Sequence, residues 1–237
     1  MTNDIIERTL FDNKVLQIEF KNTKKNNALS LTMLDKLFFI LSDTNKLKKF
    51  SCIVFKGYNN GPFSSGADLK DLNLKRESNN LKQYNDKLID ILNLLSSVKV
   101  PKISLVKTYC LGAGFIFAIH TDIILADENS IFALPATKLG IRLPNAQIKS
   151  IAKKFSNKFF LLDIIVSARV FTSREAYNAN LVSQIFKSDN FIEAYHSYIE
   201  LILNNSNEAI KYYLSKNLYL FSEERGYTLG TCASNIR

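Results

Sequence analysis

The feature that most constrains the fold is a pattern that occurs twice: an apolar strand, a turn of small residues and the start of a helix. The run "SCIVFKG" (51–57) precedes the turn "FSSGADLKDL" (63–72). The run "PKISLVKTY" (101–109) precedes "CLGAGFIFAIHT" (110–121). The first run is continuously apolar, which indicates a strand buried on both faces, as in a parallel sheet. The pattern predicts an α/β fold with a largely parallel sheet.

The rest of the chain extends this alternation. Expected strands cover 14–21, 122–127 and 130–135, and expected helices cover 31–44, 74–98, 147–155, 173–180, 191–204 and 207–220. Ser30 is a suitable N-cap for the first of these helices. Because the last stretch is only helical, the chain divides into a core, 1–188, and a C-terminal helical region, 189–237.

The composition indicates in which cellular compartment the protein works and which classes of partner it can have. The chain has no apolar run of 18 residues and no signal-peptide pattern at its start, so no membrane partner is expected. Its three widely separated cysteines argue against a disulfide framework or a zinc site, and we expect a cytoplasmic protein without a metal. The net charge of +9 favours a polyanionic partner, although a Lys- and Asn-rich composition explains it equally well.

The small-residue turns are candidates for a binding site. The first N–H groups of a helix lack acceptors within the helix, and small residues let a ligand approach them closely. Two such N–H groups aimed at one point make an oxyanion hole, which stabilises a developing negative charge on oxygen.

These motifs together closely resemble the enoyl-CoA hydratase/isomerase family, the crotonase superfamily. The resemblance runs from about residue 5 to about residue 225, and it is most specific over 101–140, where the strand, the Gly-rich turn, "DIILAD" and "FALP" follow in order. It implies a crotonase (ClpP-like) spiral of ββα units with a helical C-terminal trimerisation region. It also implies a homotrimer or a dimer of trimers that acts on an acyl thioester of coenzyme A or of an acyl carrier. No cofactor besides that coenzyme A is implied.

The resemblance also assigns site residues. The amides of Ala67 and Ala113 match the family's oxyanion-hole pair, and Gly114 is expected to let the backbone approach the thioester. The expected coenzyme A contacts are Lys25, Asn27, Ala28, Leu29, Gly66, Asp68, Leu69 and Lys70, with Lys24 beside them. A solvated surface charge is an equal alternative for each lysine, and a structural turn residue is the alternative for Asp68.

Both glutamates that hydratases of this family use are missing. Ile116 and Ala136 stand at those positions, and aliphatic side chains cannot move protons. His120 is a possible substitute, but a core histidine is the better interpretation. The remaining candidates are His196, Asp68, Asp71, Asp122, Tyr84, Tyr109, Glu77 and Asp86.

The family's glycine-rich turn after the second glutamate position is also replaced. Arg142, Pro144, Asn145 and Gln147 occupy it, which reshapes the acyl pocket. Arg142 either meets a substrate carboxylate, as a decarboxylase needs, or faces solvent.

Three functions remain open. The first is a non-hydratase enzyme that stabilises a thioester enolate, with decarboxylation as the leading reaction. The second is an acyl-CoA-binding scaffold without catalysis. The third is RNA binding through a run of basic residues. A solvent-exposed charged face is the commoner explanation of such a run, so no nucleic acid is expected. The run is Lys70, Lys75, Arg76, Lys82 and Lys87.

Overall fold

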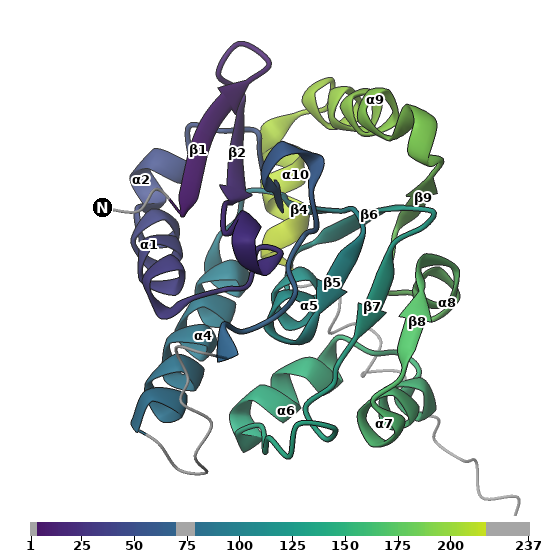
Figure 1. Ribbon diagram of the computed structural model, residues 1–237. Helices are drawn as coiled ribbons and strands as arrows, with labels where there is room; N and C mark the ends of the chain where they lie inside the picture. Colours follow the sequence, from purple (N-terminus) through teal and green to yellow (C-terminus); the bar gives the residue numbers. More distant parts are fainter. Residues whose placement is uncertain (1–3, 70–78, 217–237) are drawn as a thin grey trace, which may run out of the picture.

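The computed structural model of the chain describes residues 4–69 and 79–216, arranged as Figure 1 shows. The strands are β1 Ile5–Leu10, β2 Val15–Phe20, β3 Cys52–Gly57, β4 Lys102–Val106, β5 Tyr109–Leu111, β6 Ile123–Asp127, β7 Ile131–Ala133, β8 Val170–Thr172 and β9 Gln184–Phe186. The α-helices are α1 Leu31–Ser42, α2 Thr44–Leu47, α4 Asn79–Ser97, α5 Gly112–Ala118, α6 Asn145–Lys153, α7 Lys158–Ser167, α8 Ser173–Asn178, α9 Phe191–Leu203 and α10 Asn207–Ser215.

Six strands form the larger sheet, in the order β1-β2-β3-β4-β6-β9. β1 runs antiparallel to β2, and the other neighbouring strands are parallel, as the sequence pattern predicts. β1 itself was not expected from the sequence. It is an edge strand with three consecutive exposed residues, Glu7, Arg8 and Thr9, so it lacks the apolar alternation of a strand.

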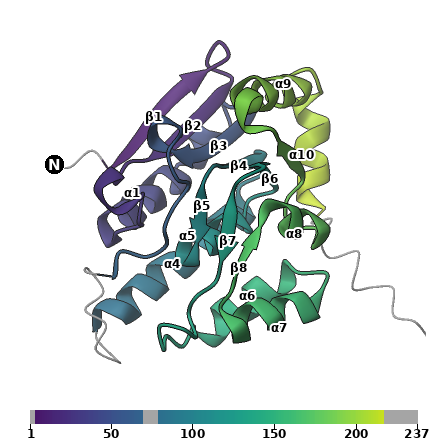
Figure 2. The same cartoon turned by 45° about the vertical axis from the view of Figure 1, so that its right-hand side comes forward.

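The larger sheet is buried on both faces, as predicted for 51–57. Ile53 and Phe55 of β3 belong to the main core, whereas Cys52 and Val54 belong to a second apolar cluster on the opposite face. Helices α1 and α4 pack on the main core, and α9 covers the second cluster (Figure 2). The α9 residues in that cluster are Phe191, Tyr195 and Ile199.

A smaller sheet, in the order β5-β7-β8, stands beside the larger one. The chain passes from a strand of the larger sheet to a strand of the smaller sheet and then to a helix: β4, β5 and α5 form one such unit, and β6 and β7 begin the next. β3 leads in the same way to Ser64, which forms a parallel bridge with Cys110 of β5. The turn before the helix therefore occupies the same place in successive units.

The predicted strand over 101–109 is wrong in one respect, because the run forms two strands in different sheets. Thr108 adopts a left-handed backbone conformation, with φ of 63°, between β4 and β5. A threonine in this conformation ends the extended run and redirects the chain into the smaller sheet.

The first turn extends through Asp68, and helical backbone appears at Leu69. The backbone on either side of Ala67 bonds to Leu29 instead of starting a helical turn. The expected helix start at 74–78 lies outside the described residues.

Other predicted elements agree with the structure. The Ser30 hydroxyl accepts a hydrogen bond from Met33 N–H at 3.2 Å, which confirms the N-cap of α1. Helices α9 and α10 match the expected 191–204 and the first part of 207–220. The division into 1–188 and 189–237 stays a prediction. No helix in the described ranges combines the length and apolarity that crossing a membrane requires.

Candidate active site

The two small-residue turns lie side by side. Ser64 N–H donates to the Tyr109 carbonyl at 3.0 Å, and Leu111 N–H donates to the Ser64 carbonyl at 2.9 Å. These bonds make neighbours of the segments that lead into the two turns. The helix starts that follow are therefore next to each other.

Glycine is required where the turns touch. Gly66 has φ of 108° and Gly112 has φ of 49°, which are conformations that other residues rarely adopt. A Cβ atom on Gly66 would lie 3.2 Å from the Leu111 carbonyl oxygen and 3.6 Å from the Gly112 Cα. The missing side chains allow the two backbones to approach each other closely.

The N–H groups of Ala67 and Ala113 point away from their own secondary structure. The Gly66 carbonyl accepts from Leu29 N–H at 2.7 Å, and Asp68 N–H donates to the Leu29 carbonyl at 3.0 Å. Because successive groups of an extended chain face opposite sides, the Ala67 N–H faces away from Leu29. Ala113 is the second residue of α5, so its N–H has no acceptor within that helix. Both amides can donate to a ligand.

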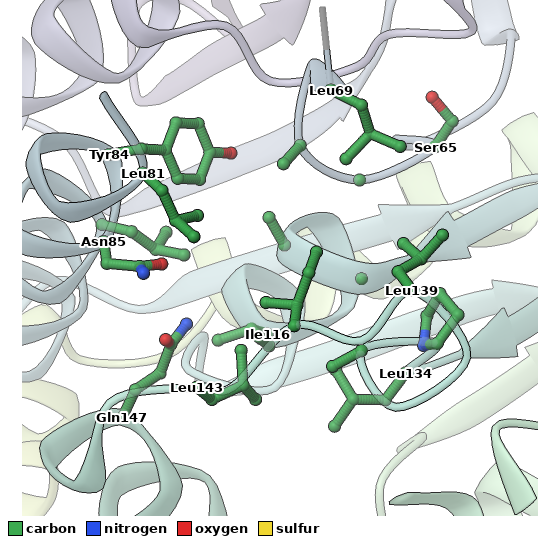
Figure 3. A pocket seen from close by; sticks show the side chains of 18 residues that line it. Ser65, Leu69, Leu81, Tyr84, Asn85, Ile116, Leu134, Leu139, Leu143 and Gln147 are labelled. Carbon is green, nitrogen blue, oxygen red and sulfur yellow. The ribbon is translucent and has the colours of Figure 1, made fainter. Parts of the chain in front are cut away.

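Both turns border one cavity of about 100 Å³, shown in Figure 3. Its apolar lining comes from Leu69, Leu81, Leu88, Ile116, Leu134, Pro135, Ala136, Leu139, Ile141 and Leu143, besides Gly66, Ala67, Gly112 and Ala113. Its polar side chains are Ser65, Tyr84, Asn85 and Gln147. No lining residue in the described part of the chain has a charged side chain.

The two positions expected for proton-transfer glutamates both line this cavity. Ile116 of α5 projects into it in Figure 3, and Ala136 follows β7. The fold thus brings the two donor turns and these two positions together. Within the described residues the cavity offers N–H donors to an anionic oxygen but no carboxylate to move a proton.

Tyr84 is the titratable side chain among the described lining residues. Its buried hydroxyl donates to the Leu29 carbonyl at 3.1 Å, which ties α4 to the segment that holds the first turn. Asp86 is exposed, and neither it nor Tyr109 lines the cavity.

His120 is a core histidine and does not line the cavity. Its Nδ1 lies 2.7 Å from the Ile116 carbonyl oxygen, so Nδ1–H donates there, and Nε2 accepts from the Ser150 hydroxyl at 2.6 Å. Burial lowers the pKa of His120 from 6.5 to about 4. The ring is therefore neutral at physiological pH and has both nitrogens paired.

Two other candidates have structural partners elsewhere. His196 of α9 is half-buried, and it packs edge-on against Phe11 and Tyr195. Asp122 pairs with the buried Lys102 ammonium at 2.7 Å and accepts from the Lys102 N–H at 2.8 Å. Neither residue lines the cavity.

The segment expected to contact coenzyme A is fastened to the first turn. The Asn27 side chain accepts from Asn22 N–H at 3.0 Å and donates to the Pro62 carbonyl at 2.7 Å. The Lys25 ammonium forms an ion pair with the buried Asp68 carboxylate. These bonds give Asn27 and Asp68 a structural role.

Ala28 and Leu29 belong to the same segment and are buried, whereas Lys24 is exposed. None of these three residues lines the cavity. Any contact that they make with a ligand would lie outside it.

Gly114 has a role other than the expected one. It does not line the cavity, and a Cβ atom there would lie 2.5 Å from the Ser64 Cβ and 2.8 Å from the Ser64 Oγ. Its missing side chain makes room for Ser64, so it lets α5 pack against the first turn.

Of the residues expected to reshape the pocket at the replaced glycine turn, Gln147 lines the cavity and Arg142, Pro144 and Asn145 do not. Arg142 is exposed and does not line it, while its neighbours Ile141 and Leu143 do. Gln147 of α6 does line it, is 1% exposed, and has no hydrogen-bond partner for Oε1 or Nε2 in the described structure. A buried unpaired amide typically costs about 1–3 kcal/mol of folding free energy. Gln147 was expected in this turn, but its lack of hydrogen-bond partners depends on packing and could not be expected from the sequence.

The expected site and the basic run extend beyond the described residues. Lys70, Asp71, Lys75, Arg76 and Glu77 lie outside the described residues. Lys82 is exposed, and Lys87 pairs with Asp35 at 3.0 Å and lies over the Phe38 ring. In the described ranges, no three His, Cys, Asp or Glu side chains come together as metal ligands do.

Comparison with known proteins agrees with this geometry. The model of the enoyl-CoA hydratase/isomerase family matches residues 11–223. The 2,3-dehydroadipyl-CoA hydratase of Escherichia coli K12 is 33% identical over 71% of this chain and 62% of its own length. The methylmalonyl-CoA decarboxylase of the same organism is 26% identical over 73% of this chain and 65% of its own length. The chain thus spans less than two thirds of either relative.

A solved structure has the same fold. An enoyl-CoA hydratase/carnithine racemase from Magnetospirillum magneticum superposes with a TM-score of 0.85. The superposition covers 93% of this chain and 82% of that protein, at 18% sequence identity.

Proposed function

The chain belongs to the enoyl-CoA hydratase/isomerase family, and we propose from this premise that it stabilises the enolate of an acyl thioester. Its fold is the crotonase spiral of ββα units. The amides of Ala67 and Ala113 hold the thioester oxygen of an acyl group joined to coenzyme A or to an acyl carrier. The coenzyme A tail runs past the segment of Asn27, Ala28 and Leu29, with Lys24 and Lys25 near its phosphates.

The reaction that the cavity supports best is decarboxylation. The substrate is a thioester that carries a carboxylate on its α-carbon. The bond between the α-carbon and the carboxylate carbon breaks, and carbon dioxide leaves. The bonding electrons pass to the α-carbon and thioester oxygen as an enolate, and the α-carbon then takes a proton from water. The cleavage step needs no general base, and apolar surroundings disfavour the localised charge of the carboxylate. One observation carries this proposal: two amide donors face a cavity in which Ile116 and Ala136 replace the proton-transfer groups.

The test is a panel of thioesters followed by mass spectrometry. We expect malonyl-CoA or methylmalonyl-CoA to lose carbon dioxide, while crotonyl-CoA stays at least about a thousandfold below typical hydration rates, because each proton-transfer group usually contributes about 10² to 10⁴. Rapid hydration of crotonyl-CoA, on the order of 10 per second or more, would show that the reaction is assigned wrongly.

A second candidate is a thioester-binding protein without turnover. It is favoured by the same two aliphatic residues, because they leave no recognised acid or base in the described cavity. Calorimetric binding of acetyl-CoA, together with no change in any thioester of the panel, would support it over the enzyme.

The oligomeric state and the cellular location are proposed from other observations. Helix α7 presents an exposed apolar stripe that suits contact with further copies of the chain, in a homotrimer or a dimer of trimers. Cys52 and Cys110 are buried, unpaired thiols, which fits the reducing cytoplasm.

A further inference from the structure

Gln147 stands out among the polar side chains of the cavity because both ends of its amide are unpaired in the described structure. It is 1% exposed, so solvent does not pair with it either. Figure 3 shows its amide projecting from α6 toward the cavity. Buried polar groups are nearly always hydrogen-bonded, so an isolated amide lining a cavity is poised to bind a ligand.

The neighbouring polar groups do not satisfy this amide. The Ser65 hydroxyl donates to the Lys25 carbonyl at 2.7 Å, and the Tyr84 hydroxyl donates to the Leu29 carbonyl. The Asn85 amide of α4 points toward Gln147 in Figure 3, but no hydrogen bond joins the two.

The charge of the cavity defines what these amides can hold. No described lining residue is charged, and Arg142 does not line the cavity, so a substrate carboxylate finds no counterion among them. The amide of Gln147 provides two N–H donors without a positive charge. Asn85 can donate to the Gln147 carbonyl oxygen and leave both of these N–H groups for a ligand.

We propose that Gln147, supported by Asn85, binds the carboxylate on the α-carbon of the thioester substrate. This assignment rests on the proposed function and names its substrate class, the malonyl-type thioesters. Hydrogen bonds from a neutral amide orient the carbon–carbon bond that will break. They do not offset the negative charge as an arginine would, and that charge moves to the oxyanion hole when carbon dioxide leaves.

Two unreactive coenzyme A thioethers test this assignment by calorimetry. In 2-carboxypropyl-CoA a CH₂ group replaces the thioester carbonyl and the carboxylate is kept; in isobutyl-CoA a methyl group also replaces the carboxylate. Gln147→Leu should lower the affinity for 2-carboxypropyl-CoA about tenfold or more, since hydrogen bonds to a charged group are lost. The same substitution should leave the affinity for isobutyl-CoA unchanged or raise it slightly.

The exposed Gln83 of α4 provides a matched control, because Gln83→Leu makes the same chemical change away from the cavity and should alter neither affinity. A thermal melt must show that Gln147→Leu is at least as stable as the wild-type protein. If Gln147→Leu weakens both probes equally, or neither, the assignment of Gln147 is wrong while the proposed function stands. If the wild-type protein binds neither these probes nor acetyl-CoA, the coenzyme A thioester function is itself wrong and this assignment falls with it.

Discussion

In the proposed function, Ala67 and Ala113 act through their backbone N–H groups, so changes to their side chains say little about their role. The residues whose side chains matter are of another kind: Ile116 and Ala136, which exclude proton transfer, and Gln147, which has an unpaired amide. Testing single residues therefore requires substitutions that remove a backbone donor or a buried polar group.

Ala113→Pro removes one donor outright, since proline has no N–H. If the protein turns over a thioester, we expect its rate to fall by roughly 10² to 10³, the usual loss for one oxyanion-hole donor. Ala113→Gly keeps the N–H and is the matched control. Circular dichroism must first show an intact fold, and a folded Ala113→Pro protein with unchanged rate and binding would mean that this turn does not face the thioester.

His120 should make the folded state sensitive to acid. Burial lowers its folded pKa to about 4, so between pH 6.5 and 4 the unfolded chain binds a proton that the native protein does not. The native state must lose stability as the pH falls through this window, by about 2 kcal/mol at pH 5. Urea denaturation at pH 7 and pH 5 measures this loss. His120→Gln should lack most of it, and an equal loss in His120→Gln would assign the effect to other groups.

At the level of secondary structure, the site is a junction between two ββα units. The bridge from Ser64 to Cys110 sets the first turn beside the second, and Gly114 lets α5 pack against Ser64. These contacts hold the two donor turns against each other.

Gly114→Ala should therefore destabilise the protein by about 1–3 kcal/mol, the usual cost of overpacking, as measured by urea denaturation. The same change should cost clearly less when Ser64 is first replaced by glycine, because the clashing Cβ atom is then gone. An equal loss of stability in both backgrounds would show that the added methyl group does not clash with the Ser64 side chain.

The sequence predicts long, strongly patterned elements of this fold well and short ones poorly. Leu31–Ser42 has an N-cap and apolar residues at helical spacing, and Cys52–Gly57 is a continuous apolar run, so both were found. The three-residue strands β8 and β9 are too short to show any periodicity, and they depend on pairing with distant strands. The break at Thr108 is likewise a tertiary effect, since nothing in threonine itself favours a left-handed conformation.

The site follows the same rule. Its donor turns could be predicted because glycine and alanine at a helix start have a local meaning. The missing hydrogen-bond partners of Gln147 could not, because they depend on how α6 packs against the rest of the molecule.

At the scale of the whole molecule, helix α7 presents an apolar stripe to solvent. Phe159, Leu162 and Val166 follow one another at helical spacing on α7 and are 86%, 59% and 69% exposed. A row of large apolar side chains on one helix face is typical of a subunit contact.

Leu162→Glu should weaken this proposed contact, because it places a charge where apolar surfaces meet. We expect light scattering after gel filtration to show a trimer or hexamer for the wild-type protein and a smaller species for Leu162→Glu. Gln83→Glu adds the same charge at an exposed polar position and should leave the assembly unchanged. A wild-type protein that is monomeric at all concentrations would contradict the assembly.

The bridge between Ser64 and Cys110 also has a consequence for synthesis on the ribosome. The first donor turn leaves the ribosome well before the second, and β5, the strand that fixes its position, is made only just before the second turn. A nascent chain that ends before α5 therefore carries only one of the two donor turns, and its apolar β3 lacks α9, which covers one of its two faces in the complete fold. Such a chain exposes surface on which chaperones act, and thioester binding should appear only once α5 has emerged.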